Sequence, residues 1–233
     1  MSGFPLLSLL VPRPILRGIN PTTHLCSINT NTRKAAFWLL SYLLHRPALI
    51  DAIRTETASA FPTADGTTID LTRLRDGHCP LLDDLWNETI RLSAYSASVR
   101  FITRDTIIGG KVLRRGARLM IPYRQLHFDE DVFGPGVDEF RPERFAEKPS
   151  LLRSDNWRPF GGGTTMCPGR HVAKRAVMLF VAMLLREFDV EMVGGPQTPV
   201  PDAEQGKPVL GIMSVKEGQD LMVRLTRRTV KKL

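Results

Sequence analysis

The stretch Arg158-Pro-Phe-Gly-Gly-Gly-Thr-Thr-Met-Cys-Pro-Gly-Arg170 carries most of the information on the fold, and we call residues 158–169 the cysteine loop. Its three consecutive glycines let the backbone turn sharply and approach a flat, bulky group. Cys167 precedes a segment that predicts a long amphipathic helix, with one apolar side made of Ala173, Ala176, Val177, Phe180, Val181, Leu184 and Phe188. A helix N-terminus favours a thiolate. One thiolate can hold an iron ion whose in-plane ligands come from a porphyrin, whereas the alternative interpretation is a glycine turn with a buried structural cysteine.

Two shorter motifs precede this stretch. Glu88-Thr-Ile-Arg91 falls in a segment that starts near Pro80 and predicts a helix, where residues three apart share one face, so its carboxylate and guanidinium can meet. Taken alone, such a pair is common and is usually an ordinary surface pair. Phe140-Arg-Pro-Glu-Arg-Phe145 follows, inside a long connection rich in proline and glycine. The three motifs in this order are far more specific than any one of them.

Together these motifs resemble the cytochrome P450 superfamily, whose haem-binding signature is F-x-x-G-x-(R/H)-x-C-x-G. Phe160, Gly163, Cys167 and Gly169 stand in register with that signature. The resemblance implies that these four residues bind the cofactor haem b, with Cys167 as the axial thiolate ligand of the iron. Thr165 stands where many members have a basic residue against a haem propionate, so the resemblance implies a weaker contact there and unchanged ligation.

The resemblance also implies roles outside the cysteine loop. Arg144 would join Glu88 and Arg91 in a buried, charge-neutralising network that holds the loop in place. Residues 88–100 and the cysteine loop are most similar to the branch that contains steroid 7α-hydroxylase, sterol 12α-hydroxylase and prostacyclin synthase. In that alignment Arg100 would pair with a haem propionate, and a solvated arginine on a strand is the alternative.

A polar segment near the beginning of the chain aligns with the family's helix above the iron. In this segment, Ser27-Ile-Asn-Thr-Asn-Thr32, Thr30 and Asn31 stand where most members have an acid followed by threonine, and they are the candidate catalytic residues. Asn31 can hydrogen-bond to bound oxygen or to an ordered water, but it cannot deliver a proton as an acid does. Hydroxylation and rearrangement of a peroxide without external electrons both stay open. A polar helix start capped by Thr or Asn is the structural alternative.

The composition sets further bounds on function. The chain has 233 residues, 32 Lys and Arg against 24 Asp and Glu, and a formal net charge of +8. Its basic residues are spread along the chain without interleaved aromatic ones, so we expect no nucleic-acid partner. Cys26, Cys79 and Cys167 are too few and too scattered for a disulfide framework, which indicates reduced thiols.

We also expect no transmembrane segment, because the apolar run at residues 4–11 is too short to cross a bilayer. The resemblance implies a location at the cytoplasmic side of the endoplasmic reticulum membrane for a full-length form. Membrane association is then expected only if such a form has an N-terminal anchor.

The predicted fold class is mainly α with small β-sheets, an α+β fold that corresponds to the C-terminal haem-binding half of a P450. We expect residues 1–22 to be irregular and residues 23–233 to form a partial P450 domain. The first helix should bury a stripe made of Ala35, Ala36, Leu39, Leu40, Leu43 and Leu44. Besides the elements already given, the patterns predict helices at about 25–45 and 48–58, and strands at 98–103, 106–108, 111–113, 118–121 and from about 190, with a hairpin turn at Gly109-Gly110.

The resemblance implies a truncated haem-thiolate monooxygenase that inserts oxygen into an apolar substrate such as a sterol, a fatty acid or a secondary metabolite. Electrons would come from an NADPH–cytochrome P450 reductase, attracted by basic residues around the cysteine loop, namely Arg158, Arg170, Lys174 and Arg175. Residues 209–212 would line the substrate pocket, with an ordinary strand as the alternative. The competing functions are a peroxide isomerase or dehydratase and a non-catalytic haem-binding fragment.

Overall fold

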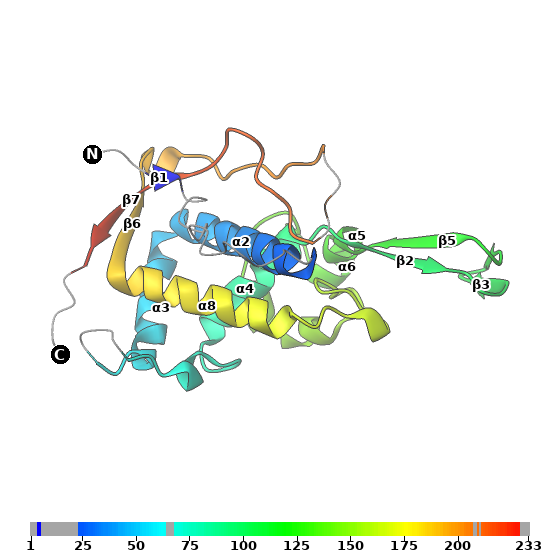
Figure 1. Ribbon diagram of the computed structural model, residues 1–233, viewed down its shortest axis with the longest axis horizontal. Helices are drawn as coiled ribbons and strands as arrows, with labels where there is room; N and C mark the ends of the chain where they lie inside the picture. Colours follow the sequence, from blue (N-terminus) through cyan, green and yellow to red (C-terminus); the bar gives the residue numbers. More distant parts are fainter. Residues whose placement is uncertain (1–3, 6–22, 64–67, 207–208, 210, 229–233) are drawn as a thin grey trace.

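The computed structural model describes residues 4–5, 23–63, 68–206, 209 and 211–228. Its centre consists of three helices, α2 (Thr23–Leu44), α4 (Pro80–Ser93) and α8 (Arg170–Glu187). Figure 1 shows α2 and α8 side by side along the longest axis, and α2 also contacts α4. No helix within the described ranges is long and apolar enough to cross a membrane. With its small antiparallel sheets, the structure confirms the predicted α+β class.

The apolar stripe predicted for α2 lies in the core, where its six members are at most 5% exposed. The spacing of three and four residues places them on one face of the helix. They share a single hydrophobic cluster with Leu82 and Leu85 of α4 and with Val181 of α8. The helix ends at Leu44 because Pro47, the first residue of α3 (Pro47–Thr57), disfavours a helical conformation at the residue before it, and Arg46 is accordingly not helical.

Helix α8 begins three residues before the predicted apolar stripe and buries only its second half. The exposed position of Ala176 contradicts the prediction for that residue, and Ala173 and Phe180 are only half-buried. The buried residues are Val177, Met178, Val181, Ala182, Leu184 and Leu185. The first two turns of α8 therefore present their apolar side chains at the surface, next to the cysteine loop.

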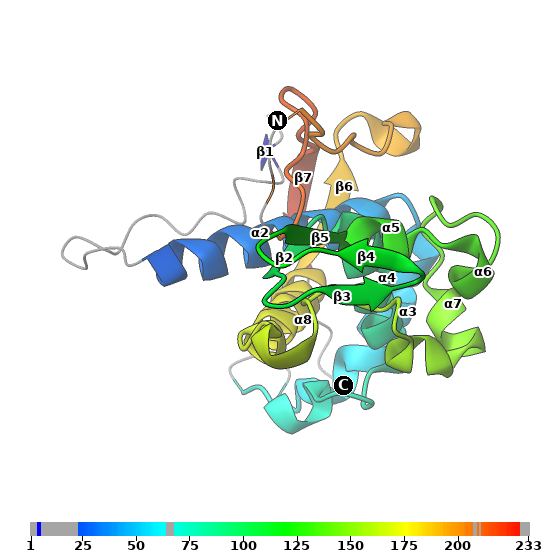
Figure 2. The same ribbon diagram turned by 90° about the vertical axis from the view of Figure 1, so that its right-hand side faces the viewer.

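A projecting arm follows α4 and contains two antiparallel pairs of strands. β2 (Ala97–Phe101) pairs with β5 (Arg118–Pro122), and β3 (Thr106–Ile108) pairs with β4 (Lys111–Leu113). Gly109 and Gly110 form the turn between β3 and β4 with φ values of 55° and 76°, which only glycine adopts readily at both positions. The strand predicted at 98–103 is shorter than expected. Figure 2 views this arm end-on.

A second sheet has the order β1-β7-β6 and lies at the opposite end of the molecule in Figure 1. β6 (Phe188–Met192) continues directly from α8 and pairs with β7 (Met222–Arg227). β1 (Phe4–Pro5) adds a short antiparallel edge to β7. Residues 1–22 were predicted to be irregular; this strand departs from that prediction, and the rest of the segment lies outside the described residues.

The long connection between the arm and α8 contains three short helices, α5 (Tyr123–His127), α6 (Glu130–Phe133) and α7 (Glu143–Glu147). The connection also contains single-turn helices at Pro149–Arg153 and Gly163–Thr165. Elsewhere in the chain, single-turn helices occur at Ala58–Ala60, Leu71–Leu74 and Gly195–Gln197. A small second core stabilises the connection and consists of Phe133, Val137, Phe145 and Leu151, with Trp157 packed against it. This region shows no helical periodicity in the sequence because its helices are only about one turn long.

We predict that Leu40→Ala lowers the free energy of unfolding by about 2–5 kcal/mol, because it opens a cavity where α2 meets the rest of the core. Leu71→Ala is the matched control, since Leu71 is 58% exposed and should change stability by about 0.5 kcal/mol or less. Urea titrations of both variants measure the difference. Equal losses in the two variants would contradict the assignment of this core.

Candidate functional site

The site begins with an ion pair inside α4. Glu88 and Arg91 are one turn apart on the helix, and both side chains are fully buried. Arg91 Nε donates to Glu88 Oε2 at 2.8 Å, and Arg91 Nη2 donates to Glu88 Oε1 at 2.8 Å. Two parallel hydrogen bonds of this kind fix the geometry of both planar groups.

Arg144 of α7 brings a second guanidinium to the same carboxylate. Its Nε lies 3.4 Å from Glu88 Oε1, and its side chain is 3% exposed. The backbone N–H of Arg141 also donates to Glu88 Oε1, at 3.0 Å. The structure thus brings together the three residues that the P450 resemblance connects, with two positive charges around one negative charge.

The remaining donors of the two guanidiniums bind main-chain carbonyls of the connection. Arg91 donates to the carbonyl oxygens of His127 at 2.8 Å and of Glu139 at 3.4 Å, while Arg144 donates to those of Phe133 and Gly136. Buried N–H groups without acceptors are costly, so these carbonyls are needed to complete the site. The ionic network therefore fixes the path of residues 127–144 over α4.

The cysteine loop is closed by its own backbone. The N–H of Cys167 donates to the carbonyl of Phe160 at 2.9 Å, and the Arg170 side chain donates to the carbonyl of Cys167 at 2.9 Å. Gly163 has a φ of 68°, which favours glycine, and a Cβ on Gly169 would lie 3.8 Å from the sulfur of Cys167. Phe160 stacks on Trp86 of α4, with ring centroids 6.5 Å apart.

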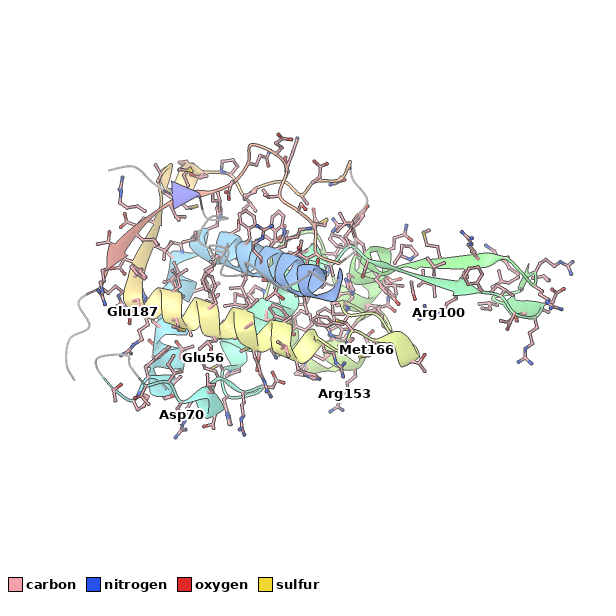
Figure 3. All side chains as sticks on the ribbon, in the orientation of Figure 1. Glu56, Asp70, Arg100, Arg153, Met166 and Glu187 are labelled. Atoms are coloured by element: carbon pink, nitrogen blue, oxygen red, sulfur yellow. The ribbon has the colours of Figure 1, made fainter. Side chains whose placement is uncertain are left out.

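The loop presents the Cys167 thiol at the surface, just before the first residue of α8. This disagrees with the alternative of a buried structural cysteine. Met166 directly precedes Cys167 and Val172 lies in the first turn of α8, and these two apolar residues are 39% and 64% exposed. Figure 3 shows Met166 at the end of α8 opposite Glu187.

The donor set around Cys167 restricts which metal group can bind there. In the described ranges, no group of three or more His, Cys, Asp or Glu side chains could hold a metal ion. The porphyrin of haem brings its own in-plane ligands, so the single thiolate that Cys167 offers is sufficient to hold its iron. The exposed thiol and its apolar neighbours fit haem on these grounds.

Asn31 of α2 is connected to the end of α4 through Ile212. Its Oδ1 accepts a hydrogen bond from the backbone N–H of Ile212 at 3.2 Å, and Ile212 forms an antiparallel bridge with Ala94, the residue that follows α4. Thr30 is exposed on α2. Asn31 therefore contacts Gly211 and Ile212 of the turn predicted to line the pocket, and Leu210 lies outside the described residues.

Arg100 lies on β2 of the arm, in register with Leu119 of β5, and is exposed. Its Nη1 donates to the carbonyl of Val99 at 3.0 Å. Figure 3 shows Arg100 on the arm, beyond the end of α8. The side chain of Thr165 is outside the described part of the structure, as are the side chains of residues 23–29, which include Cys26 and most of the predicted oxygen-side segment.

The basic residues expected around the cysteine loop do not all contribute free charge. Lys174 Nζ lies 2.8 Å from Asp76 Oδ1 and 2.7 Å from Asp83 Oδ1. Burial lowers the pKa of Lys174, but the hydrogen bonds to Asp76 and Asp83 outweigh it and raise the pKa above its usual value. Arg158 pairs with Asp155 at 2.5 Å. Arg175 is exposed and Arg170 is half-buried, which leaves these two as the basic surface of the loop.

One buried residue of the site was not found from the sequence. The ring of His127 accepts a hydrogen bond from the backbone N–H of Arg158, the first residue of the cysteine loop, at 3.0 Å. Its hydrogen-bond partners, Arg158 and Arg91, are 31 and 36 residues away in the sequence, so no local sequence pattern identifies His127.

Comparison with known proteins agrees with this geometry. The family model "Cytochrome P450" matches residues 29–220, and the chain belongs to this family. It is 30% identical over 216 residues to the 7-alpha-hydroxycholest-4-en-3-one 12-alpha-hydroxylase of Oryctolagus cuniculus, covering 84% of this chain and 42% of that protein. It is 33% identical over 186 residues to the cytochrome P450 monooxygenase nodJ of Hypoxylon pulicicidum, covering 73% of this chain and 36% of that protein.

The prostacyclin synthase of Rattus norvegicus is 28% identical over 221 residues, covering 85% of this chain and 42% of that protein. These relatives confirm the resemblance to the branch of sterol hydroxylases and prostacyclin synthase. The chain spans about two fifths of the length of these three relatives.

We predict that Glu88→Gln lowers the free energy of unfolding by about 3–5 kcal/mol, because it leaves two guanidiniums buried without a compensating charge. Glu147→Gln is the control, since its ion pair with Arg141 is exposed and should be worth about 1 kcal/mol or less. Chemical unfolding of both variants provides the comparison. A loss in Glu88→Gln no larger than in the control would contradict the structural role of the network.

We predict that Gly211→Ala costs more stability than Gly116→Ala. Both glycines have positive φ values, 114° and 86°, but only at Gly211 would a Cβ collide with Asn31, 2.5 Å from its Nδ2. Backbone strain alone should cost about 1–2 kcal/mol, and the collision should add roughly 1–3 kcal/mol. In an Asn31→Ala background this excess of Gly211→Ala over Gly116→Ala should vanish. Thermal unfolding of the two glycine variants, each with Asn31 and with Asn31→Ala, would measure it. An excess that persists in that background would disprove the contact.

Proposed function

We propose that the protein acts as a haem-thiolate monooxygenase that inserts oxygen into an apolar substrate. The observation that carries this proposal is the exposed thiol of Cys167 at the start of α8, in a chain of the cytochrome P450 family. Cys167 would hold the iron of haem b through its sulfur, and Phe160, Gly163 and Gly169 would shape the loop that presents this sulfur. When bound, the haem supplies oxygen activation, which no side chain of a protein provides.

The chain's own residues would hold and shield that group. The hydrogen bond from Cys167 N–H to Phe160 and the network of Glu88, Arg91 and Arg144 keep the thiol in a fixed position. Thr30 and Asn31 would hydrogen-bond to oxygen or water on the other side. Asn31 already holds the turn at Ile212 through its amide oxygen, so it would also position the pocket wall. Arg100 would neutralise a propionate at the haem edge.

We propose an NADPH–cytochrome P450 reductase as the electron donor, docked on the basic surface formed by Arg170 and Arg175. The substrate class follows from the relatives, whose names include sterol 12-alpha-hydroxylases and a fungal monooxygenase. A sterol or an apolar secondary metabolite would contact the turn at 209–212. The described free thiols, Cys79 and Cys167, are compatible with the cytoplasmic side of the endoplasmic reticulum membrane. We propose that residues 23–233 form part of a single P450 domain.

We predict that the reduced, carbon-monoxide-bound protein, produced with a supply of haem, has the far red-shifted Soret band of thiolate ligation. Cys167→Ser should lose that band because serine offers no thiolate. Cys79→Ser is the matched control and should keep it, since Cys79 is buried and its sulfur donates to the carbonyl of Arg73. Absorption spectra of the three proteins make the measurement.

Turnover of a steroid with NADPH and reductase then tests the oxygen insertion. Product that forms only with reductase supports the monooxygenase. Haem uptake without turnover would reduce the function of this chain to haem binding. A thiolate band that survives in Cys167→Ser would disprove the ligand assignment.

A further inference from the structure

His127 occupies a position between the ionic network and the cysteine loop. It is the last residue of α5 and is fully buried. Its carbonyl accepts from Arg91 Nη1 at 2.8 Å, which fixes its backbone on the network. Its ring lies 5.6 Å from that of Trp157, the residue just before the cysteine loop.

The imidazole connects these two parts through its Nε2 atom. The backbone N–H of Arg158 donates to Nε2 at 3.0 Å, so Nε2 carries the lone pair and the proton is on Nδ1. Burial and the nearby charge of Arg91 lower the pKa of His127 to about 3. The ring is therefore neutral and remains an acceptor at physiological pH.

Nδ1 has no hydrogen-bond partner among the side chains and backbone that the structure describes. A buried N–H without a partner is costly, and a phenylalanine or leucine would fill this apolar position without that cost. Compared with phenylalanine or leucine, histidine adds a hydrogen-bond acceptor, Nε2, at this position. A residue that serves only packing would not need it.

We propose that His127 is a positioning residue of the haem site, whose Nε2 atom holds the Arg158 N–H and so fixes where the cysteine loop begins relative to the network of Glu88 and Arg91. This inference rests on the proposed function, because the loop it fixes is the one that would ligate haem. His127 itself would touch neither haem nor substrate. Its effect on Cys167 passes through the backbone of residues 158–167.

Two amide substitutions separate the role of the acceptor atom from that of the buried volume. In His127→Gln the side-chain oxygen is as many bonds from Cβ as Nε2 and can accept from Arg158, whereas in His127→Asn it is one bond shorter and cannot reach. In the haem-free 233-residue chain, amide hydrogen exchange followed by mass spectrometry reports on peptides that cover residues 158–163. We expect His127→Asn to exchange roughly tenfold faster there, the loss expected for one buried hydrogen bond, and His127→Gln to stay near the unmutated protein.

Peptides from α4 serve as the internal control in the same experiment. Faster exchange confined to the loop in His127→Asn alone supports the tether, whereas equal loss in the loop of both variants would overturn the role of the acceptor atom. Unchanged exchange in both variants would overturn it. So would equal loss of protection across α4 and the loop in both, because His127 would then serve the packing of the whole fold.

The haem-loaded protein gives the second readout. His127→Asn should show a smaller share of the thiolate Soret band than His127→Gln, since a displaced loop moves the Cys167 sulfur. Equal bands in the two variants would overturn the link to haem. Failure of every protein, including the unmutated one, to bind haem would instead contradict the proposed function, while hydrogen exchange would still decide whether the tether exists.

Discussion

The carboxylate of Glu88 is the constraint on which the rest of this structure depends. It lies between Arg91 and Arg144, where all three side chains are almost completely excluded from water. Charges in such a place are stable only if every donor finds an acceptor. The carbonyls that complete the set come from residues 127–139, so a connection whose helices are only about one turn long acquires a defined path.

The sequence predicted the parts of this arrangement that local patterns encode. The stripe from Ala35 to Leu44 has helical spacing because one face of α2 is buried, and Gly109-Gly110 marks a turn because its backbone needs positive φ at both residues. The spacing of Glu88 and Arg91 placed both on one helical face. Cys167 was found from its motif, and its exposure agrees with a ligand rather than a structural thiol.

Other features depend on contacts between distant residues and have no local signal. Ala176 fits the apolar period of α8 and is nevertheless exposed, because the period alone does not show which turns of the helix other elements cover. Lys174 was expected to attract a partner, and its pairing with Asp76 and Asp83 emerges only when α8 meets the start of α4. His127 also lacks a local sequence signal, since its ring and its carbonyl bind residues from two other segments.

Helix α4 connects the two sides of the candidate site. Through Arg91 and His127 it reaches the first residue of the cysteine loop, on the side of the thiol. At the same C-terminal end, Ala94, the residue after the helix, pairs with Ile212, whose N–H donates to Asn31, and the N–H of Tyr95 donates to the carbonyl of Gly211 at 2.7 Å. Because α4 is buried along most of its length, a displacement of either side would have to move the core. The last turn of α4 therefore connects the buried core both to the start of the cysteine loop and to the turn at Gly211 and Ile212.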